Sequence, residues 1–537
     1  MSPRRLQHFL LLLVVVALAL PLASVLASWL QLDAATAQIL DAMARTVLPQ
    51  YTRTSLWLCL LVGIGVIGVG TAAAAAVTLF DFPGRRTAEW ALLLPLAMPA
   101  YVVAYGYTDF FQFAGPAQSW LRATFGLSGR VLPEVRSVGG AAWVFTFSLY
   151  PYVYLLARAA LAERATHLME AARLLGASPS RRILSVALPL ARPAIAAGAA
   201  LALMETLADY GVASYFGIQT YTAGIYKAWL SMDNRAAAAQ LATVLLLVVL
   251  LLLVLEQRAQ RRLRFATGRG AHAGSADARP VRLAGWRGAL ATLGCTAPVL
   301  LGFVLPVCFM LRPLLADGAA LPWERFALWS WNSVRLGLTG ALLAVAIALA
   351  LAFSLRRRPD RLTRAAVRMV GLGYAIPGAV IVVGLLLPVG WLQAAAPQSG
   401  IGALVTGTAV GIVWAYLVRF TAVALQSLQA GYARIPTSFD DSARMLGANG
   451  WSLLARVHWP LLTRATAAAA LLVFVDVMKE LPATLVLRPF NSDTLAVVAY
   501  QFARDERLGE AALPSLALVA VGLLPVLLLS RTIRQTI

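Results

Sequence analysis

The sequence predicts an all-α polytopic membrane protein with about twelve transmembrane helices, arranged as two parallel repeats of six. Its 537 residues are 60% hydrophobic and only 13% charged, with a mean hydropathy of +0.75, which is far from the balance of a soluble domain. Long apolar runs recur along the whole chain, and its two halves resemble each other. Since a bilayer core supplies no water to backbone groups, these runs are expected to be helices.

A helical span of the bilayer core needs about 20 apolar residues, and short charged or Pro/Gly-containing stretches separate runs of this length. In the first half we expect spans near residues 9–30, 54–79, 91–110, 140–157, 191–212 and 239–255. In the second half we expect them near 289–311, 333–355, 366–390, 401–425, 463–482 and 512–530. Each half therefore has an even number of spans, and the two repeats point the same way in the membrane.

The first run allows a second interpretation, because Arg4 and Arg5 precede it and small residues follow at Ala23–Ala27. A cleaved signal peptide has this arrangement, but its apolar core is usually only about 7–15 residues long. The longer run favours a retained span. The three cysteines also fall inside predicted spans, where they act as small hydrophobic residues and suggest no cysteine chemistry: Cys59, Cys295 and Cys308.

The formal charge of +21 is distributed as in a membrane protein, and we expect no nucleic-acid partner. Basic clusters fall in alternate connections, at Arg85–Arg86, Arg181–Arg182, residues 256–288 and Arg356–Arg358. Placing these connections in the cytoplasm follows the positive-inside rule. Both termini are then expected in the cytoplasm.

The two halves align with constant offsets over two stretches. Ser55–Gly106 parallels Ser333–Gly384, and further along Gly176 parallels Gly447, with one change of offset between the stretches. A basic segment rich in Gly, Ala and Ser lies between the halves and is expected to be a flexible cytoplasmic linker. We therefore divide the chain into a first repeat (1–255), a linker (256–288) and a second repeat (289–537).

One connection in each repeat, between its fourth and fifth spans, carries the most specific pattern. The first copy reads Glu170-Ala171-Ala172-Arg173-Leu174-Leu175-Gly176-Ala177, and the second reads Asp441-Ser442-Ala443-Arg444-Met445-Leu446-Gly447-Ala448. Each copy predicts a helix that ends at a glycine of positive φ and restarts before a Leu-Pro or Trp-Pro pair. Small residues would let another protein approach closely, and the apolar pair before each glycine suits a groove. Interfacial helices resting on lipid headgroups are the alternative.

These two segments resemble the Glu-Ala-Ala loops of binding-protein-dependent transport permeases. The resemblance implies the type I importer fold, the bacterial inner membrane as location, a dimeric ATP-binding-cassette (ABC) ATPase that docks on both loops, and a periplasmic solute-binding protein. It assigns the docking role to Glu170, Ala171, Ala172, Gly176, Asp441, Ala443 and Gly447. The second copy departs from the family pattern, because Asp441 stands for Glu and Ser442 stands for Ala.

The chain shows no means of hydrolysing ATP. A Walker-type phosphate loop needs a Gly-rich turn followed by Lys and Ser or Thr, and neither Lys227 nor Lys479 has this context. We expect no enzyme activity and no cofactor on this chain, with ATP and Mg²⁺ bound by the partner ATPase. The four histidines show no metal-ligand or catalytic spacing, so we expect surface or interface roles for them: His8, His167, His272 and His458.

A narrower resemblance concerns the solute. Residues 478–484 (Met-Lys-Glu-Leu-Pro-Ala-Thr) and 487–490 (Leu-Arg-Pro-Phe), with 204–211 in the first repeat, are similar to the fused permeases of ferric-iron importers. Thiamine and other small solutes are carried by related fused permeases. A separate binding protein would select the solute.

Two carboxylate pairs fall within predicted spans, where ionisable groups are costly unless they are paired or face water. Glu205 and Asp209 share one helical face, as do Asp476 and Glu480. We expect them, with Lys479, to line the pathway of a cationic solute, and no fixed metal site is predicted. The alternative is structural, with Lys479 neutralising one of its neighbours.

Two other classes of membrane protein were weighed. A twelve-span secondary transporter would share the hydropathy and the parallel halves, but it would not need the paired cytoplasmic loops. A membrane enzyme would need a nucleophile, a metal cluster or a phosphate loop, and none is apparent in the sequence.

Overall fold

The computed structural model describes residues 3–31, 34–162, 172–267, 280–316, 323–357 and 359–535. Helices dominate these residues, and the two strands among them are each two residues long.

The predicted spans are confirmed. Within the described residues, eleven helices are long and apolar enough to cross a membrane, and a bent pair of helices brings the number to twelve. The spans of the first half are Leu12–Leu30, Val47–Leu79, the bent pair, Val138–Ala160, Ile183–Ala208 and Arg235–Ala259. Those of the second half are Trp286–Leu315, Trp323–Arg357, Gly378–Ala395, Ala409–Ala433, Gly450–Lys479 and Leu508–Leu528. The chain is therefore an all-α polytopic membrane protein.

The third span of each repeat is not the single helix that the hydropathy predicts. In the first repeat α4 (Arg85–Ala91) and a short 3₁₀ turn precede Pro99, and α5 (Ala100–Phe111) follows it. In the second, α17 (Arg361–Gly371) and another 3₁₀ turn precede Pro377, and α18 (Gly378–Ala395) follows it. A proline has no N–H and disfavours helical geometry in the residue before it. Both helices therefore break at the aligned prolines.

By its internal contacts the chain forms two compact units, which do not coincide with the sequence repeats. Unit 1 contains Met1–Ala42, Ile225–Leu246 and Pro322–Val498, and unit 2 contains Met43–Gly224, Leu247–Leu321 and Ala499–Ile537. In unit 2 the core is formed by α3 (Val47–Leu79), α7 (Val138–Ala160) and α10 (Leu188–Ala208). In unit 1 the core is formed by the repeat-equivalent helices α16 (Trp323–Arg357), α20 (Ala409–Ala433) and α23 (Trp459–Lys479).

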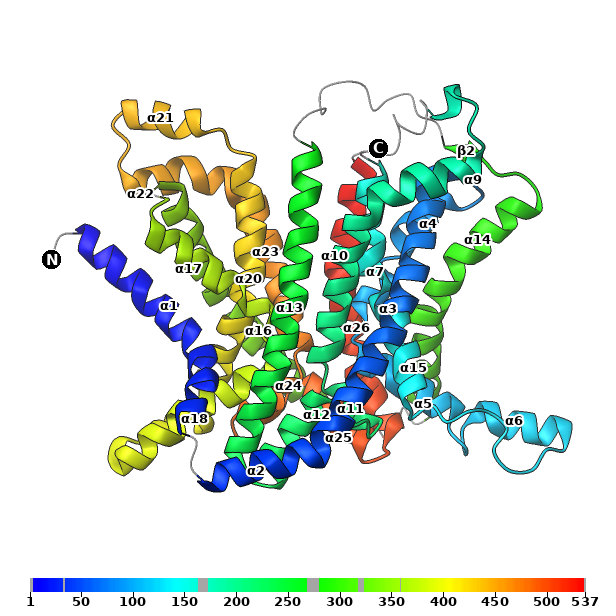
Figure 1. The fold of residues 1–537 in the computed structure, drawn as a ribbon, viewed down its shortest axis with the longest axis horizontal. Helices are drawn as coiled ribbons and strands as arrows, with labels where there is room; N and C mark the ends of the chain where they lie inside the picture. The colour runs from blue at the N-terminus through cyan, green and yellow to red at the C-terminus, as the bar shows by residue number, and fades with distance from the viewer. Residues whose placement is uncertain are drawn as a thin grey trace. The chain divides into compact units, whose positions relative to one another are not determined.

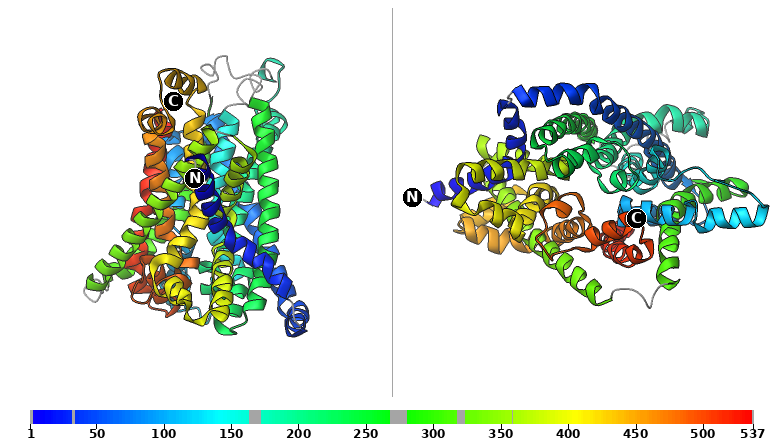
Figure 2. Two further views of the ribbon diagram at one scale, coloured as in Figure 1. Left: turned by 90° about the vertical axis from the view of Figure 1, so that its left-hand side faces the viewer. Right: turned by 90° about the horizontal axis from the view of Figure 1, so that it is seen from below.

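The units differ from the repeats because parts of each repeat group with the other one. These parts are the first helix of each repeat, residues 225–246 of the first repeat and residues 499–537 of the second. In unit 1, α1 (Pro3–Ala27) lies alongside α17 and α18 (Figures 1 and 2). In unit 2, α14 (Trp286–Val299) and α15 (Leu305–Ala316) pack against helices of the first repeat, including α3 and α5. The short strands Phe80–Asp81 (β1) and Val281–Arg282 (β2) pair beside them.

Both ends of the predicted linker have regular structure. The helix α13 (Arg235–Thr267) continues past Glu256, and β2 lies at the other end. Residues 268–279 of the linker lie outside the described residues.

We call the first helix of each repeat, which packs with the other repeat, the exchanged helix. In each of them a proline leaves a backbone carbonyl without its helical N–H donor, and a side chain donates to that carbonyl instead. Pro21 has no N–H to donate to the carbonyl of Ala17, and Trp414 Nε1 donates to that oxygen instead, at 2.9 Å. In the second repeat a π-helical turn (Leu300–Val304) precedes Pro306, and Tyr107 Oη donates to the carbonyl of Leu301 at 2.7 Å. In a π-helix the N–H of one residue bonds the carbonyl five residues earlier. The N–H that Pro306 lacks is therefore the one that would bond the Leu301 carbonyl.

The same prolines lie against the aligned glycines Gly106 and Gly384. A methyl group on Gly106 would lie 3.1 Å from the carbonyl oxygen of Pro306. On Gly384 it would overlap the carbonyl oxygen of Pro21. Ser24 Oγ also donates to the carbonyl of Gly384. The glycines therefore allow close approach of the exchanged helices.

We expect Gly384→Ala to destabilise unit 1 by about 1–3 kcal/mol, because the added methyl group meets backbone atoms that cannot move freely. Gly106→Ala should be milder, since the added methyl group would lie 3.1 Å from the Pro306 carbonyl oxygen, a tight contact without the overlap found at Gly384. Gly68→Ala is the control, because nothing lies within 4 Å of a methyl group there. The measurement is the Tm of the purified protein in detergent. Equal Tm values for the Gly384 and Gly68 variants would contradict this packing.

Candidate functional site

The segment singled out in the second repeat forms a helical hairpin at one end of unit 1. The helix α21 (Thr437–Met445) lies across the ends of the membrane helices in Figure 1. After a turn, α22 (Gly450–Ser452) and a π-helical stretch (Leu453–His458) lead into α23 at Trp459-Pro460. The predicted break and restart are confirmed in this copy.

The first repeat has the same arrangement in unit 2, as far as it is described. Residues 172–174 are helical, whereas Glu170 and Ala171 lie outside the described residues. After the turn, α9 (Pro179–Arg182) and a π-helical stretch (Ile183–Ala187) lead into α10 at Leu188-Pro189. Both copies therefore place a π-helical stretch before the proline, where the missing N–H interrupts the α-helical bonding.

The glycine of each copy terminates its helix as predicted. Gly176 has a φ of 79° and Gly447 a φ of 82°. Gly176 N–H bonds the carbonyl of Arg173 at 3.0 Å, and Ala177 N–H bonds that of Ala172 at 3.0 Å. The second copy repeats this pattern, as Gly447 N–H bonds Arg444 at 3.0 Å and Ala448 N–H bonds Ala443 at 2.9 Å. This is the Schellman motif. We refer to residues 172–177 and 443–448 as the paired turns.

The paired turns expose large apolar side chains. Leu174 and Leu175 are 89% and 87% exposed, and their counterparts Met445 and Leu446 are each 89% exposed. Bulky apolar residues this open to solvent contribute nothing to the core of their own chain. Two equivalent copies of one exposed apolar pair indicate an interaction surface.

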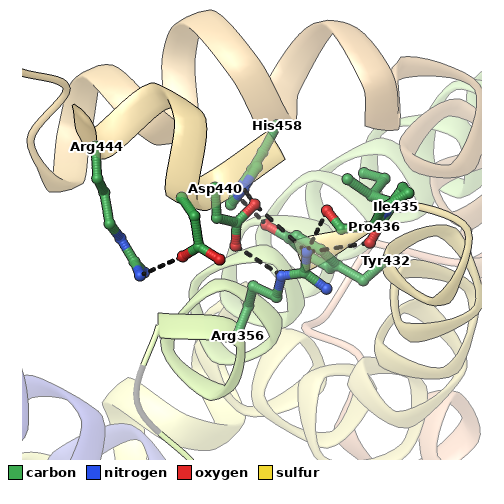
Figure 3. A network of polar contacts seen from close by, with 8 residues as sticks. Arg356, Tyr432, Ile435, Pro436, Asp440, Arg444 and His458 are labelled. Carbon is green, nitrogen blue, oxygen red and sulfur yellow. Dashed lines mark hydrogen bonds and ion pairs between the residues drawn. The ribbon is translucent and has the colours of Figure 1, made fainter. Parts of the chain in front are cut away.

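A buried polar network holds the second turn to the membrane helices (Figure 3). Asp440, on α21, accepts from Arg356 Nε at 2.8 Å and contacts His458 Nε2 at 3.0 Å. Tyr432 Oη lies 3.2 Å from His458 Nδ1. Arg356 Nη2 also donates to the carbonyls of Ile435 and Pro436, each at 3.0 Å. The network joins the ends of α16, α20 and α21 to the π-helical stretch before α23.

Burial alone would raise the pKa of Asp440, but the hydrogen bonds and charge of Arg356 and His458 outweigh it and lower that pKa. Asp440 is therefore a carboxylate at neutral pH. Its stabilising contribution is present above the ordinary pKa of an aspartic acid and is lost only as the pH falls through the lowered value.

Sequence reasoning missed this network. The surface or interface role expected for His458 is wrong, since its side chain is fully buried; the side chains of the other three histidines lie outside the described residues. Asp440 was overlooked beside the motif residue Asp441, whose exposed side chain pairs with Arg444 at 3.5 Å. The partners Arg356 and His458 lie 84 and 18 residues from Asp440 in sequence. In the first repeat the positions aligned with Arg356 and His458 hold Thr78 and Ala187.

The carboxylates within the spans take part in helix capping. Asp209 ends α10, and its Oδ1 accepts from Val212 N–H at 2.8 Å in α11 (Gly211–Tyr215). The aligned Glu480 ends α23, and its oxygens accept from the N–H groups of Ala483 and Thr484 at 2.8 and 2.9 Å. These two bonds cap α24 (Pro482–Leu487).

The carboxylates of Asp476 and Glu480 also interact with basic side chains. Arg419 Nη1 lies 3.7 Å from Glu480 Oε1, and Lys479 interacts electrostatically with Asp476. Glu205 and Asp209 are half-buried. Within the described residues no group of three His, Cys, Asp or Glu side chains could hold a metal ion.

The helical repeats and paired turns define an integral membrane component of a solute importer, and comparison with known families agrees. The family model "Binding-protein-dependent transport system inner membrane component" matches the chain twice, at residues 66–265 and 342–535. The chain belongs to this family and is a multi-pass inner-membrane permease of an ABC importer.

Among individual relatives, two match along most of the chain. The Fe(3+)-transport system permease protein FbpB 2 of Haemophilus influenzae is 26% identical over 91% of both chains. The probable ABC transporter permease protein y4fN of Sinorhizobium fredii is 26% identical over 85% of this chain and 83% of its own. The maltose/maltodextrin permease MalG of Yersinia pestis is 28% identical over 35% of this chain and 60% of its own.

We expect Asp440→Asn to lower the stability of the α21 hairpin by about 3 kcal/mol, because it leaves the part-buried Arg356 without its counter-charge. Asp441→Asn is the control, since exposed ion pairs contribute only about 0–1 kcal/mol. The measurement is the rate of limited proteolysis within residues 437–449. The expected result is faster cleavage for Asp440→Asn alone, and equal rates would contradict the anchoring role.

Proposed function

We propose that this chain is the permease of a ferric-iron importer and that a separate ABC ATPase dimer docks on its paired turns. The observation that carries the docking is the repeated, Gly-terminated turn with two exposed apolar side chains. A dimer of identical subunits would offer one matching groove to each copy. The ATPase would bind ATP and Mg²⁺, since this chain lacks a phosphate loop.

With the paired turns facing the cytoplasm, both chain termini would lie there too, because each repeat has an even number of spans. A periplasmic binding protein would deliver the solute to the opposite face. Residues Ala172, Gly176, Ala443 and Gly447 would shape the docking turns, and Asp441 would add a charge beside the second turn. Asp440, through Arg356 and His458, would hold that turn rigid, so that movement of the ATPase passes to α16 and α23.

Ferric iron is favoured as the solute by the relative named for it, whose match extends over 91% of both chains. Permeases named for maltose, molybdenum and sulfate also match, but over only 35%, 33% and 26% of this chain. Asp209 and Glu480 would supply hard oxygen atoms that suit a ferric ion. Thiamine or another small solute on the same machinery is the alternative that transport assays would reveal.

We expect Leu175→Asp and Leu446→Asp to weaken ATPase binding, because burial of one leucine contributes about 1.5–3 kcal/mol. Each single change should weaken binding by about tenfold or more, and the double variant should lose coupled uptake. The fold should be unaffected, since both side chains are almost fully exposed. Binding of the purified ATPase to the permease in nanodiscs is the measurement.

Phe490→Asp is the matched control, because Phe490 is 92% exposed but follows α24 rather than α21. Normal ATPase binding by both leucine variants would mean that the paired turns rest on lipid instead. Uptake by the purified permease alone on an ion gradient would identify a secondary transporter.

The charge of Asp209 can be separated from its capping role. Asparagine keeps an oxygen that can accept the Val212 N–H, so Asp209→Asn should leave α11 intact. We expect it to reduce ferric-iron uptake by about tenfold, the equivalent of ~1.4 kcal/mol. Asp233→Asn, at an exposed position, is the control. Normal uptake at normal membrane abundance would leave Asp209 with the capping role alone.

A further inference from the structure

Five buried tyrosines gather near Asp209 in unit 2. Tyr101 and Tyr105 lie on α5, Tyr210 and Tyr215 lie at α11, and Tyr500 lies on α25 (Leu495–Arg504). Their exposed fractions are between 0% and 8%. The ring centroid of Tyr105 lies 5.7 Å from that of Tyr101 and 4.8 Å from that of Tyr215. We call these residues the tyrosine cluster.

Hydroxyl groups within the cluster meet one another. Tyr500 Oη lies 2.7 Å from Ser214 Oγ and 3.4 Å from Tyr210 Oη. Tyr105 interacts electrostatically with Tyr101, Tyr215, Tyr500 and Asp209. The cluster therefore brings several phenols together with one carboxylate where α5, α11 and α25 meet.

The hydroxyl of Tyr105 has no hydrogen-bond partner, although its side chain is fully buried. An unsatisfied buried polar group costs about 1–3 kcal/mol. Phenylalanine would fill the same space without this cost. The hydroxyl is therefore not explained by packing, and its position beside Tyr101, Tyr215 and Asp209 distinguishes it from other buried hydroxyls without a partner, such as that of Tyr150.

The second repeat shows that the fold does not need these phenols. The positions aligned with Tyr101 and Tyr105 hold Ala379 and Val383. Those aligned with Tyr210 and Tyr215 hold Leu481 and Val486. The helices of unit 1 form with apolar residues at these places, and only the acid at position 209 has an acidic counterpart, Glu480.

We propose that the tyrosine cluster and Asp209 form a site of oxygen ligands for the transported metal cation. This inference rests on the proposed ferric-iron function. Phenolate and carboxylate are hard anionic ligands, and tyrosinate is a known ligand of iron in proteins. Coordination would release the phenolic proton to water, so the phenol ligands would be neutral in the empty site and anionic when the metal is bound.

Two cations lie near the cluster. Arg136 lies over the ring of Tyr215, with its Cζ 4.8 Å from the ring centroid, and its Nη2 donates to Tyr215 Oη at 3.4 Å. Its Nη1 lies 3.1 Å from Glu506 Oε1, so its charge is compensated. Arg504 interacts electrostatically with Tyr500. Among the groups that interact electrostatically with Tyr105, Asp209 is the carboxyl group.

The test is Tyr105→Phe, which removes only the hydroxyl. The permease is reconstituted in liposomes with its ATPase and ferric-loaded binding protein, and iron imported per ATP hydrolysed is measured. We expect this ratio to fall about tenfold, while stimulation of ATP hydrolysis by the loaded binding protein stays at the wild-type level. A variant that only misfolds would lower both the amount of iron imported per ATP hydrolysed and the stimulation of ATP hydrolysis by the loaded binding protein.

Tyr150→Phe is the matched control, because the hydroxyl of Tyr150 is also fully buried and without a hydrogen-bond partner, but lies on α7 outside the cluster. It should retain the wild-type ratio. A wild-type ratio for Tyr105→Phe, or an equal fall for both variants, would overturn the inference and leave ferric-iron import intact. If the wild-type protein imports no ferric iron, the proposed solute and this site both fail.

Discussion

Inside a bilayer, a backbone group that loses its helical partner must find another within the protein, and this constraint accounts for much of the structure. Trp414 satisfies the carbonyl freed by Pro21, and Tyr107 satisfies one freed by Pro306. Where α10 and α23 end within the membrane, Asp209 and Glu480 satisfy the next N–H groups. At these four positions the freed backbone group is thus matched by a specific side chain.

The two repeats share a fold but are not equivalent. Both carry the exchanged first helix, the proline break in the third span and the Gly-terminated turn. In the described residues, the second turn has the buried network of Asp440, Arg356 and His458, and the first repeat has Thr78 and Ala187 at two of those positions. The tyrosine cluster, conversely, belongs to the first repeat and to Tyr500. In the described residues the second repeat therefore has the buried ionic support of its turn, and the first repeat has the buried phenols.

Sequence reasoning predicted what depends on local pattern and could not predict what depends on distant partners. Hydropathy located the spans, and the glycine at the end of each docking helix predicted its positive φ. Hydropathy did not reveal that the third spans break, although Pro99 and Pro377 occupy aligned positions in the two repeats. The exchange of first helices was also invisible, because nothing local to Pro21 points to Gly384. The network around Asp440 joins residues up to 84 positions apart, and no single sequence pairs them.

The central claim is that both paired turns contact one kind of ATPase subunit, and thiol protection tests it most directly. Cysteine is placed at position 175 or 446 in a variant lacking Cys59, Cys295 and Cys308, and its labelling by a water-soluble thiol reagent is followed in membranes. Both positions should react rapidly without the ATPase, as their 87% and 89% exposure implies, and both should be protected when it is bound. Labelling that the ATPase leaves unchanged at both positions would contradict the account.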